Sequence, residues 1–216
     1  MKKIMFNDKF HLTQAVLDGT KRQTRRIIIS NDAFERGNKE YWSKQEIKEW
    51  NEEFTRRVLN MPESKRREVE HPKYKVGEIV AIAQAYKDIY PNADFELVKN
   101  NEFMTESAGW ANKMFVRADL MPHQIRITNV HVERLQDISE EDCLKEGVKF
   151  VGKLKADGVN DYFFNVLPTP KHPNSNIVGL FNSPRVAYAE LLDRVSGKGT
   201  WQSNPFVWVY DFELVK

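Results

Sequence analysis

Hydrophobic and polar positions alternate most regularly near the end of the chain. In residues 206–214 (FVWVYDFEL) the large side chains that share one face of an extended strand are Phe206, Trp208, Tyr210, Phe212 and Leu214. Residues 123–135 (HQIRITNVHVERL) alternate as well, but the apolar parity shifts near Thr128–Asn129, which predicts a β-bulge there. Residues 76–86 (VGEIVAIAQAY) form a glycine turn followed by an apolar run, as in a buried strand.

Three segments have helical spacing instead. Residues 8–18 predict a short helix capped by Asn7 or Asp8, with Gly19 just beyond its end in the left-handed conformation. Ser139 and the acids after it predict a helix over 139–146 that ends at Gly147. Ser183-Pro184 opens a third helix, which ends at Gly197. Its apolar stripe is expected at Val186, Ala189, Leu192 and Val195.

Two segments interrupt this pattern and are interpreted as insertions. Residues 31–72 are rich in both charges, yet they hold one helical apolar stripe: Ile47, Trp50, Phe54 and Val58. The stripe is consistent with a helix docked on a core or with a lid. Residues 150–183 are rich in Gly, Pro and Asn and predict a long loop containing a hairpin, and residues 87–113 predict a loop.

Several strands and a few short helices in 216 residues predict an α+β class and a single domain over 1–216. The net charge of +2 means that any attraction to nucleic acid must come from a local patch. Cys143 is the single cysteine, so there is no internal disulfide, which suits a reducing cytoplasm. No stretch has the apolar length of a signal peptide or a membrane span. The scattered histidines predict no metal, and no cofactor motif is present.

The local patch is the stretch LDGTKRQTRRIII, residues 17–29. Its four cations fall within six positions: Lys21, Arg22, Arg25 and Arg26. They can simply follow a helix end, where cations are favoured, with the isoleucines beginning a strand. Alternatively, neighbouring cations and burial lower the pKa of Lys21, which then takes the proton of the Thr24 hydroxyl and makes it a nucleophile.

Two further residues are candidates for function. Glu146 lies at the negative end of the 139–146 helix, where an acid is slightly unfavourable, so it is either a tolerated exposed residue or a functional one. Trp201 lies in a glycine-containing loop and is the better candidate for stacking on a base. The aromatic residues of 206–212 are expected in the core.

In order along the chain, several motifs resemble those of the ASCH domain family, which belongs to the PUA-like superfamily. They are GTKRQTRR (19–26), YKVGE (74–78), IRIT (125–128), LQDISEED (135–142) leading into Glu146-Gly147, and GTWQSNPFVWVYDF (199–212), the last similar to prophage-encoded members. The resemblance implies a PUA-like β-barrel with flanking short helices and a helical insertion, and a basic cleft for RNA or a nucleoside-sized ligand.

The resemblance also implies an activity, because bacterial N4-acetylcytidine amidohydrolases are small ASCH proteins. By motif, Lys21 would be the base, Thr24 the nucleophile and Glu146 the proton donor to the leaving amine. Arg26 would bind a phosphate or oxyanion, with Arg22, Arg25 and Trp201 as further ligand contacts. This chain is about twice as long as those hydrolases and has Thr20 where an arginine is usual.

Three functions are therefore open from the sequence. The first is a binding module for RNA or a modified nucleoside, and the second is an amidohydrolase acting on acylated cytidine. The third is a phage or prophage accessory protein without catalysis, which binds a protein partner through residues 31–72. Convergence of Lys21, Thr24 and Glu146 in one pocket would favour the second.

Overall fold

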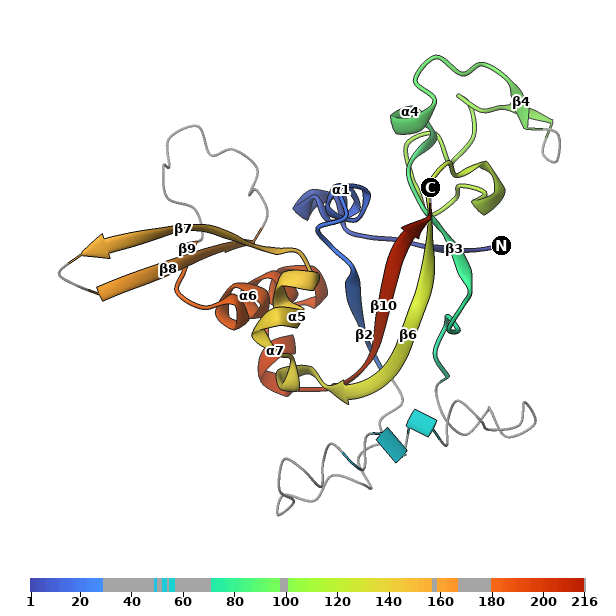
Figure 1. Cartoon of the computed structure of the whole chain (residues 1–216). Coiled ribbons are helices and arrows are strands. Elements are labelled where there is room, and N and C mark those ends of the chain that lie inside the picture. The colour runs from blue at the N-terminus through green and yellow to red at the C-terminus, as the bar shows by residue number, and fades with distance from the viewer. Residues whose placement is uncertain are drawn as a thin grey trace.

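A computed structural model of the chain describes residues 1–28, 49, 52–53, 55–56, 71–97, 101–156, 159–166 and 180–215. Its centre is a five-stranded sheet in the order β1-β3-β6-β10-β2 (Figure 1). These strands are β1 (Lys2–Ile4), β3 (Ile79–Ile82), β6 (Gln124–Arg134), β10 (Phe206–Val215) and β2 (Gln23–Ile27). The β1–β3 pair is parallel and the other pairs are antiparallel, so the protein is α+β with a mixed sheet.

The two long strands, β6 and β10, form the middle of the sheet as the alternation predicts. Their register shifts between Asp211 and Phe212, whose partners are Asn129 and Ile127. Thr128 is thus the extra residue, which confirms the predicted bulge. The aromatic residues of β10 from Phe206 to Phe212 are buried in the main core, also as predicted.

β2 begins earlier than the isoleucines suggest. The strand comprises Gln23, Thr24, Arg25, Arg26 and Ile27, so the cations lie within the sheet and do not merely follow a helix end. β1 and β2 are the two edges of the sheet. Among the described strands they do not pair with each other, and no closed barrel forms.

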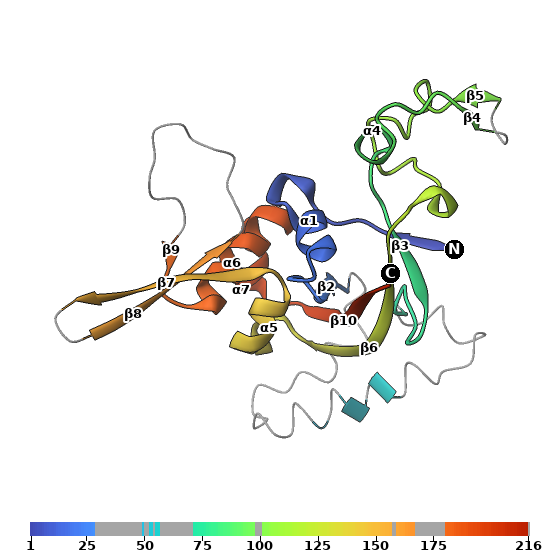
Figure 2. The same cartoon turned by 45° about the horizontal axis from the view of Figure 1, so that its top comes forward.

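Short helices cover one side of the sheet (Figure 2). They are η1 (Asp8–Phe10), α1 (Leu12–Leu17), η4 (Leu135–Asp137), α5 (Glu140–Lys145), α6 (Pro184–Ser196) and α7 (Thr200–Ser203). The helix expected over 8–18 is divided at His11, which has a left-handed backbone. Ser139 caps α5 by accepting a hydrogen bond from the Asp142 amide, and Ser183 caps α6 through the Arg185 amide, both as predicted. Gly19 has the expected positive φ of 71°.

The apolar stripe predicted for α6 is right at Leu192 but wrong at its two ends. Val186 is 49% exposed and Val195 is also exposed, whereas the residues buried in α6 are Pro184, Ala187, Tyr188, Leu191 and Leu192. These positions recur at three and four residues and make a broader face than the predicted stripe. The correction matters for the site, because it places Tyr188 on the buried face of α6.

Two excursions leave the sheet. β7 (Val148–Ala156), β8 (Val159–Val166) and β9 (Leu180–Phe181) form a projecting three-stranded sheet, so a hairpin occupies much of the predicted 150–183 loop (Figure 1). The other excursion contains α4 (Tyr86–Ile89), β4 (Glu96–Leu97), β5 (Glu102–Phe103) and η3 (Ala118–Leu120), with a small core of its own. β3 is therefore shorter than the predicted strand over 76–86, because Tyr86 already begins a helix.

The helical stripe predicted in the 31–72 insertion (Ile47, Trp50, Phe54 and Val58) lies outside the described residues. Within the described part, no helix is both long and apolar enough to cross a membrane.

Candidate functional site at the edge strand

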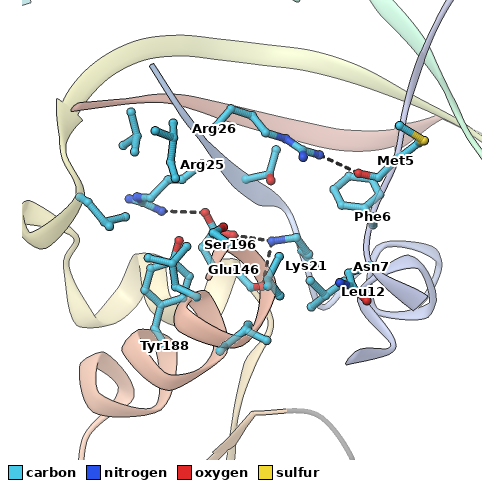
Figure 3. Close-up of a pocket in the computed structure, with 17 residues that line it drawn as sticks. Met5, Phe6, Asn7, Leu12, Lys21, Arg25, Arg26, Glu146, Tyr188 and Ser196 are labelled. Atoms are coloured by element: carbon cyan, nitrogen blue, oxygen red, sulfur yellow. Dashed lines mark hydrogen bonds and ion pairs between the residues drawn. The ribbon is translucent and has the colours of Figure 1, made fainter. Parts of the chain in front are cut away.

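A cavity of about 380 Å³ lies at the edge formed by β2. Lys21 and Thr24 line it together with Glu146, which is more than a hundred residues further along the chain. Arg26 and Tyr188 line it as well. Figure 3 shows the labelled side chains reaching the cavity from several segments: the chain after β1, α1, β2 and the residues just before it, the end of α5, and α6. Apolar residues of α6 also line the cavity. The cavity thus combines a few polar groups with an apolar surface, as in many small-molecule sites.

Lys21 is held just before β2, and its side chain is only 3% exposed. Its backbone amide donates to the carbonyl of Ala15, which fixes the turn after α1. Nζ donates to the carbonyls of Gln23 (2.8 Å) and Glu146 (2.9 Å) and to the Glu146 carboxylate. Burial lowers the pKa of Lys21 although the Glu146 carboxylate opposes that change. The amine is thus nearer to neutrality than an exposed lysine.

Glu146 follows α5 and is 3% exposed, so it is not a tolerated surface acid. Its amide caps the helix by donating to the carbonyl of Asp142, and Gly147 then turns the chain away. The carboxylate lies between two cations. Lys21 contacts Oε2, and Arg25 donates to Oε1 at 3.0 Å (Figure 3). This double contact fixes the position of the carboxylate in the cavity wall.

Arg25 does not offer its charge to a ligand, contrary to the prediction. Its guanidinium donates to Glu133 (2.7 Å), to the side-chain carbonyl of Gln23 (2.5 Å) and to Glu146. Burial alone would lower the pKa of Arg25, but the carboxylates of Glu146 and Glu133 raise it above its ordinary value. We therefore assign Arg25 to a buried ion cluster that positions Glu146.

Thr24 and Arg26 occupy the opposite face of β2, because successive side chains of a strand alternate. Thr24 is 5% exposed and lines the cavity. Arg26 donates to the carbonyl of Met5 at 2.7 Å and lies 6.0 Å from the Phe6 ring centroid. It has no carboxylate partner among the described residues, which leaves most of its donors for a ligand.

Two other predicted ligand contacts lie away from the cavity. Arg22 is exposed and does not line it, and its amide donates to the carbonyl of Lys145. Trp201 lies in α7 and not in a loop. Its ring packs edge-on against Tyr188 at 6.2 Å and faces Arg185 at 5.8 Å. The tryptophan thus packs against Tyr188 and does not itself line the cavity.

The sequence reasoning missed Tyr188 and Phe6. Tyr188 lines the cavity and is buried, and burial raises the pKa of its hydroxyl well above the ordinary value, so it stays neutral. Its position in a correctly assigned α6 stripe was the available signal. Phe6 lies with its ring 6.0 Å from both Lys21 Nζ and the Arg26 guanidinium, and no local pattern indicates this.

Comparison of the chain with models of protein families, with curated proteins and with solved structures gave no match. Within the described residues, no group of three His, Cys, Asp or Glu side chains is arranged to hold a metal ion. The chemistry of the cavity is therefore inferred from its own residues.

Proposed function

We propose that the chain is an ASCH-type protein of the PUA-like superfamily that binds a nucleoside-sized ligand in the 380 Å³ cavity and removes an N4-acyl group from cytidine-type substrates. One observation carries the proposal. Lys21, Thr24 and Glu146, the residues that the motif resemblance selects, line the same cavity, and Lys21 contacts Glu146 directly. A chance Lys-x-x-Thr motif would not be expected to meet a buried glutamate from a distant helix.

Lys21 and Glu146 act as a pair that shares a proton. Burial lowers the pKa of Lys21. In the proposed reactive state, the amine has passed one proton to the carboxylate that it contacts. The amine of Lys21 then takes the proton of the Thr24 hydroxyl as Oγ1 attacks the acyl carbon. The tetrahedral oxyanion that forms faces Arg26, the cation of the cavity without a carboxylate partner among the described residues.

The intermediate collapses when the bond between the acyl carbon and N4 breaks. Glu146 gives its proton to N4, so cytidine leaves as a neutral amine and the acyl group stays on Thr24 as an ester. Lys21 is then an ammonium and Glu146 a carboxylate. A water molecule next attacks the ester and gives one proton to Glu146, while Lys21 returns its proton to Thr24. The products are cytidine and a carboxylic acid, and the pair is restored.

The Lys21 ammonium has three acceptors, the carbonyls of Gln23 and Glu146 and the Glu146 carboxylate. These contacts hold Nζ in place and, once the proton moves to Glu146, leave a lone pair on the amine. Thr24 lies on the other wall of the same cavity. Substrate binding is expected to bring the hydroxyl and the amine together, since catalytic hydrogen bonds often shorten only in the complex.

The test is to incubate the protein with N4-acetylcytidine and to follow cytidine by chromatography. The wild type is expected to release cytidine, and Thr24→Val, which keeps the shape but loses the hydroxyl, is expected to lose at least about a hundredfold in rate. Thr24→Ser is the matched control and keeps measurable turnover. Absence of product from the wild type, or full activity of Thr24→Val, refutes the hydrolase.

A binding module for RNA or a modified nucleoside is the second candidate. It is favoured by the exposed Arg26 at the cavity rim and by the full set of acceptors around Lys21. It predicts affinity without turnover. The third function, a protein partner bound through residues 31–72 by a non-catalytic prophage accessory protein, depends on residues that mostly lie outside the described part. A cytoplasmic location suits all three proposals.

A further inference from the structure

A second cavity of about 190 Å³ lies beside the first one and shares part of its lining. Arg26, Met5 and Ile27 line both cavities, so the Arg26 side chain lies on their shared wall. Trp208 and Tyr210 of β10 form part of the second cavity. Its volume is well above the ~10–15 Å³ that a single water needs, so a small polyatomic group fits.

Trp208 lines this cavity and carries a buried N–H donor without a hydrogen-bond partner among the described residues. It lies directly opposite Arg26 in the ladder between β10 and β2, so both side chains are on the same face. The residue is 2% exposed, and within the described part of the chain its indole Nε1 has no acceptor. A buried indole N–H normally finds a partner. A ligand atom that accepts a hydrogen bond would satisfy it.

The remaining polar groups of the second cavity are rich in donors and positive charge. Arg26, Lys73 and His71 line it, and none of the described lining residues is acidic. Lys73 is positioned by its own amide, which donates to the Tyr210 hydroxyl at 2.9 Å, and its Nζ lies 5.5 Å from the Tyr74 ring centroid. The Tyr74 hydroxyl is occupied because it donates to the carbonyl of Lys3. An acceptor with negative charge matches this set of groups.

We propose that the second cavity is an oxyanion site, built by Arg26, Lys73 and the Trp208 indole N–H, that takes a phosphate group. The phosphate can be free or can belong to a nucleotide whose nucleoside part occupies the first cavity. The nucleotide form rests on the proposed function of the first cavity, because the two cavities are contiguous at Arg26. Under that form, the preferred substrate class is an acylated cytidine nucleotide or an RNA end carrying a phosphate.

The Trp208 indole resonance tests the site without any need for turnover. The chain has five tryptophans, and the indole signal of Trp208 in a ¹⁵N-labelled sample is the one that Trp208→Phe removes. Inorganic phosphate, cytidine 5′-monophosphate and cytidine are titrated separately at constant ionic strength. A saturable downfield shift of that signal with phosphate is expected, since the indole gains a charged acceptor.

Lys73→Gln is expected to weaken this titration by about tenfold, the loss of one charge-assisted contact. Lys75→Gln is the matched control, because Lys75 is a nearby exposed lysine that does not line the cavity. Tighter binding of the monophosphate than of phosphate or cytidine supports the nucleotide source, and equal binding of phosphate and the monophosphate supports a free oxyanion.

No movement of the Trp208 signal with either phosphate-bearing probe overturns the oxyanion site. Equal weakening by Lys73→Gln and Lys75→Gln also overturns it, because the effect would then reflect general surface charge. The hydrolase is judged by cytidine release from N4-acetylcytidine. A phosphate-dependent Trp208 shift without cytidine release would therefore keep the anion site and reject the hydrolase.

Discussion

Arg25 and Arg26 are adjacent in β2 but meet opposite surroundings. On one face of the strand, Arg25 is buried among the side chains of Glu133, Glu146 and Gln23. On the other, Arg26 is exposed and contacts the carbonyl of Met5 and the ring of Phe6. Successive side chains of a strand point to opposite faces. Two adjacent arginines can therefore differ in role, one structural and one able to bind a ligand.

The difference shows why a basic cluster cannot be assigned to one role as a unit. Charge that is already paired inside the protein holds other residues in place. In this cluster, Arg25 and Lys21 fix the Glu146 carboxylate from two sides. Unpaired charge at a cavity rim is what attracts an anion. Substitutions of Arg25 and Arg26 are therefore expected to have different effects.

The largest effect is expected from Arg25→Met. The substitution removes the ion pairs of Arg25 with Glu133 and Glu146. Because it leaves buried charge without its partner, the free energy of unfolding should fall by about 3–5 kcal/mol. Arg26→Met, the matched control on the other face, should cost no more than about 1 kcal/mol because its contacts are exposed. Urea denaturation of both variants measures the difference. Equal losses would mean that the two faces of β2 do not differ in this way.

Lys21→Met should lower stability by an intermediate amount and should abolish turnover. Burial already disfavours the charge of Lys21, and Arg25 still pairs with Glu146 after the substitution. An apolar side chain of similar length therefore costs about 1–2 kcal/mol, less than Arg25→Met. Cytidine release should fall to background because the base is gone. A loss of stability as large as that of Arg25→Met would show that Lys21 is mainly structural.

Alkaline pH should destabilise the folded protein through Cys143, which is buried in the main core. Burial raises the pKa of its thiol to about 12 from an ordinary 9.0. Between these values the folded state binds more protons than the unfolded state, so the free energy of unfolding falls as the pH rises. The contribution of Cys143 between pH 8 and pH 10 is about 1.4 kcal/mol.

The check for Cys143 is the drop in urea midpoint from pH 8 to pH 10 in the wild type and in Cys143→Ala. The variant should show the smaller drop, whatever its stability at pH 8. Identical drops in the two proteins would mean that the thiol titrates normally in the folded state.

The smallest effect concerns salt. If the cavity rim binds single-stranded RNA, Arg26→Met should lower the slope of log affinity against log salt concentration by about 0.7, the share of one phosphate contact. Arg22→Met is the control, because Arg22 is exposed but does not line the cavity. Equal changes in slope would indicate a diffuse basic surface and not a specific contribution of Arg26.

Local patterns were sufficient for the parts of the fold whose cause is local. Alternation in residues 206–214 and the parity shift at Thr128–Asn129 predicted β10 and the bulge, because strand pleating leaves a direct trace in the sequence. The serine caps of α5 and α6 were predicted for the same reason, since a cap and its acceptor amide are two or three residues apart.

The assignment of the cluster to two faces was beyond the local pattern. The four cations around Thr24 do not have the apolar alternation that marks a strand, so the start of β2 was not predicted. The partners of Arg25 come from β6 and from the end of α5, which are distant in the sequence. The α6 stripe was misplaced because two apolar faces compete in that sequence. The motif resemblance brought Lys21, Thr24 and Glu146 together, but it could not separate Arg25 from Arg26 or foresee the position of Trp201.

The ladder of β2 also determines when the site can form during synthesis. Among the described strands β2 pairs with β10 alone, where Ile27 lies opposite Val207. The catalytic candidates near the N-terminus therefore leave the ribosome long before their strand partner does. A nascent chain would carry an unpaired edge, with Lys21 not yet buried, until β10 has been synthesised. Premature termination just before β10 should therefore leave the candidate site unformed.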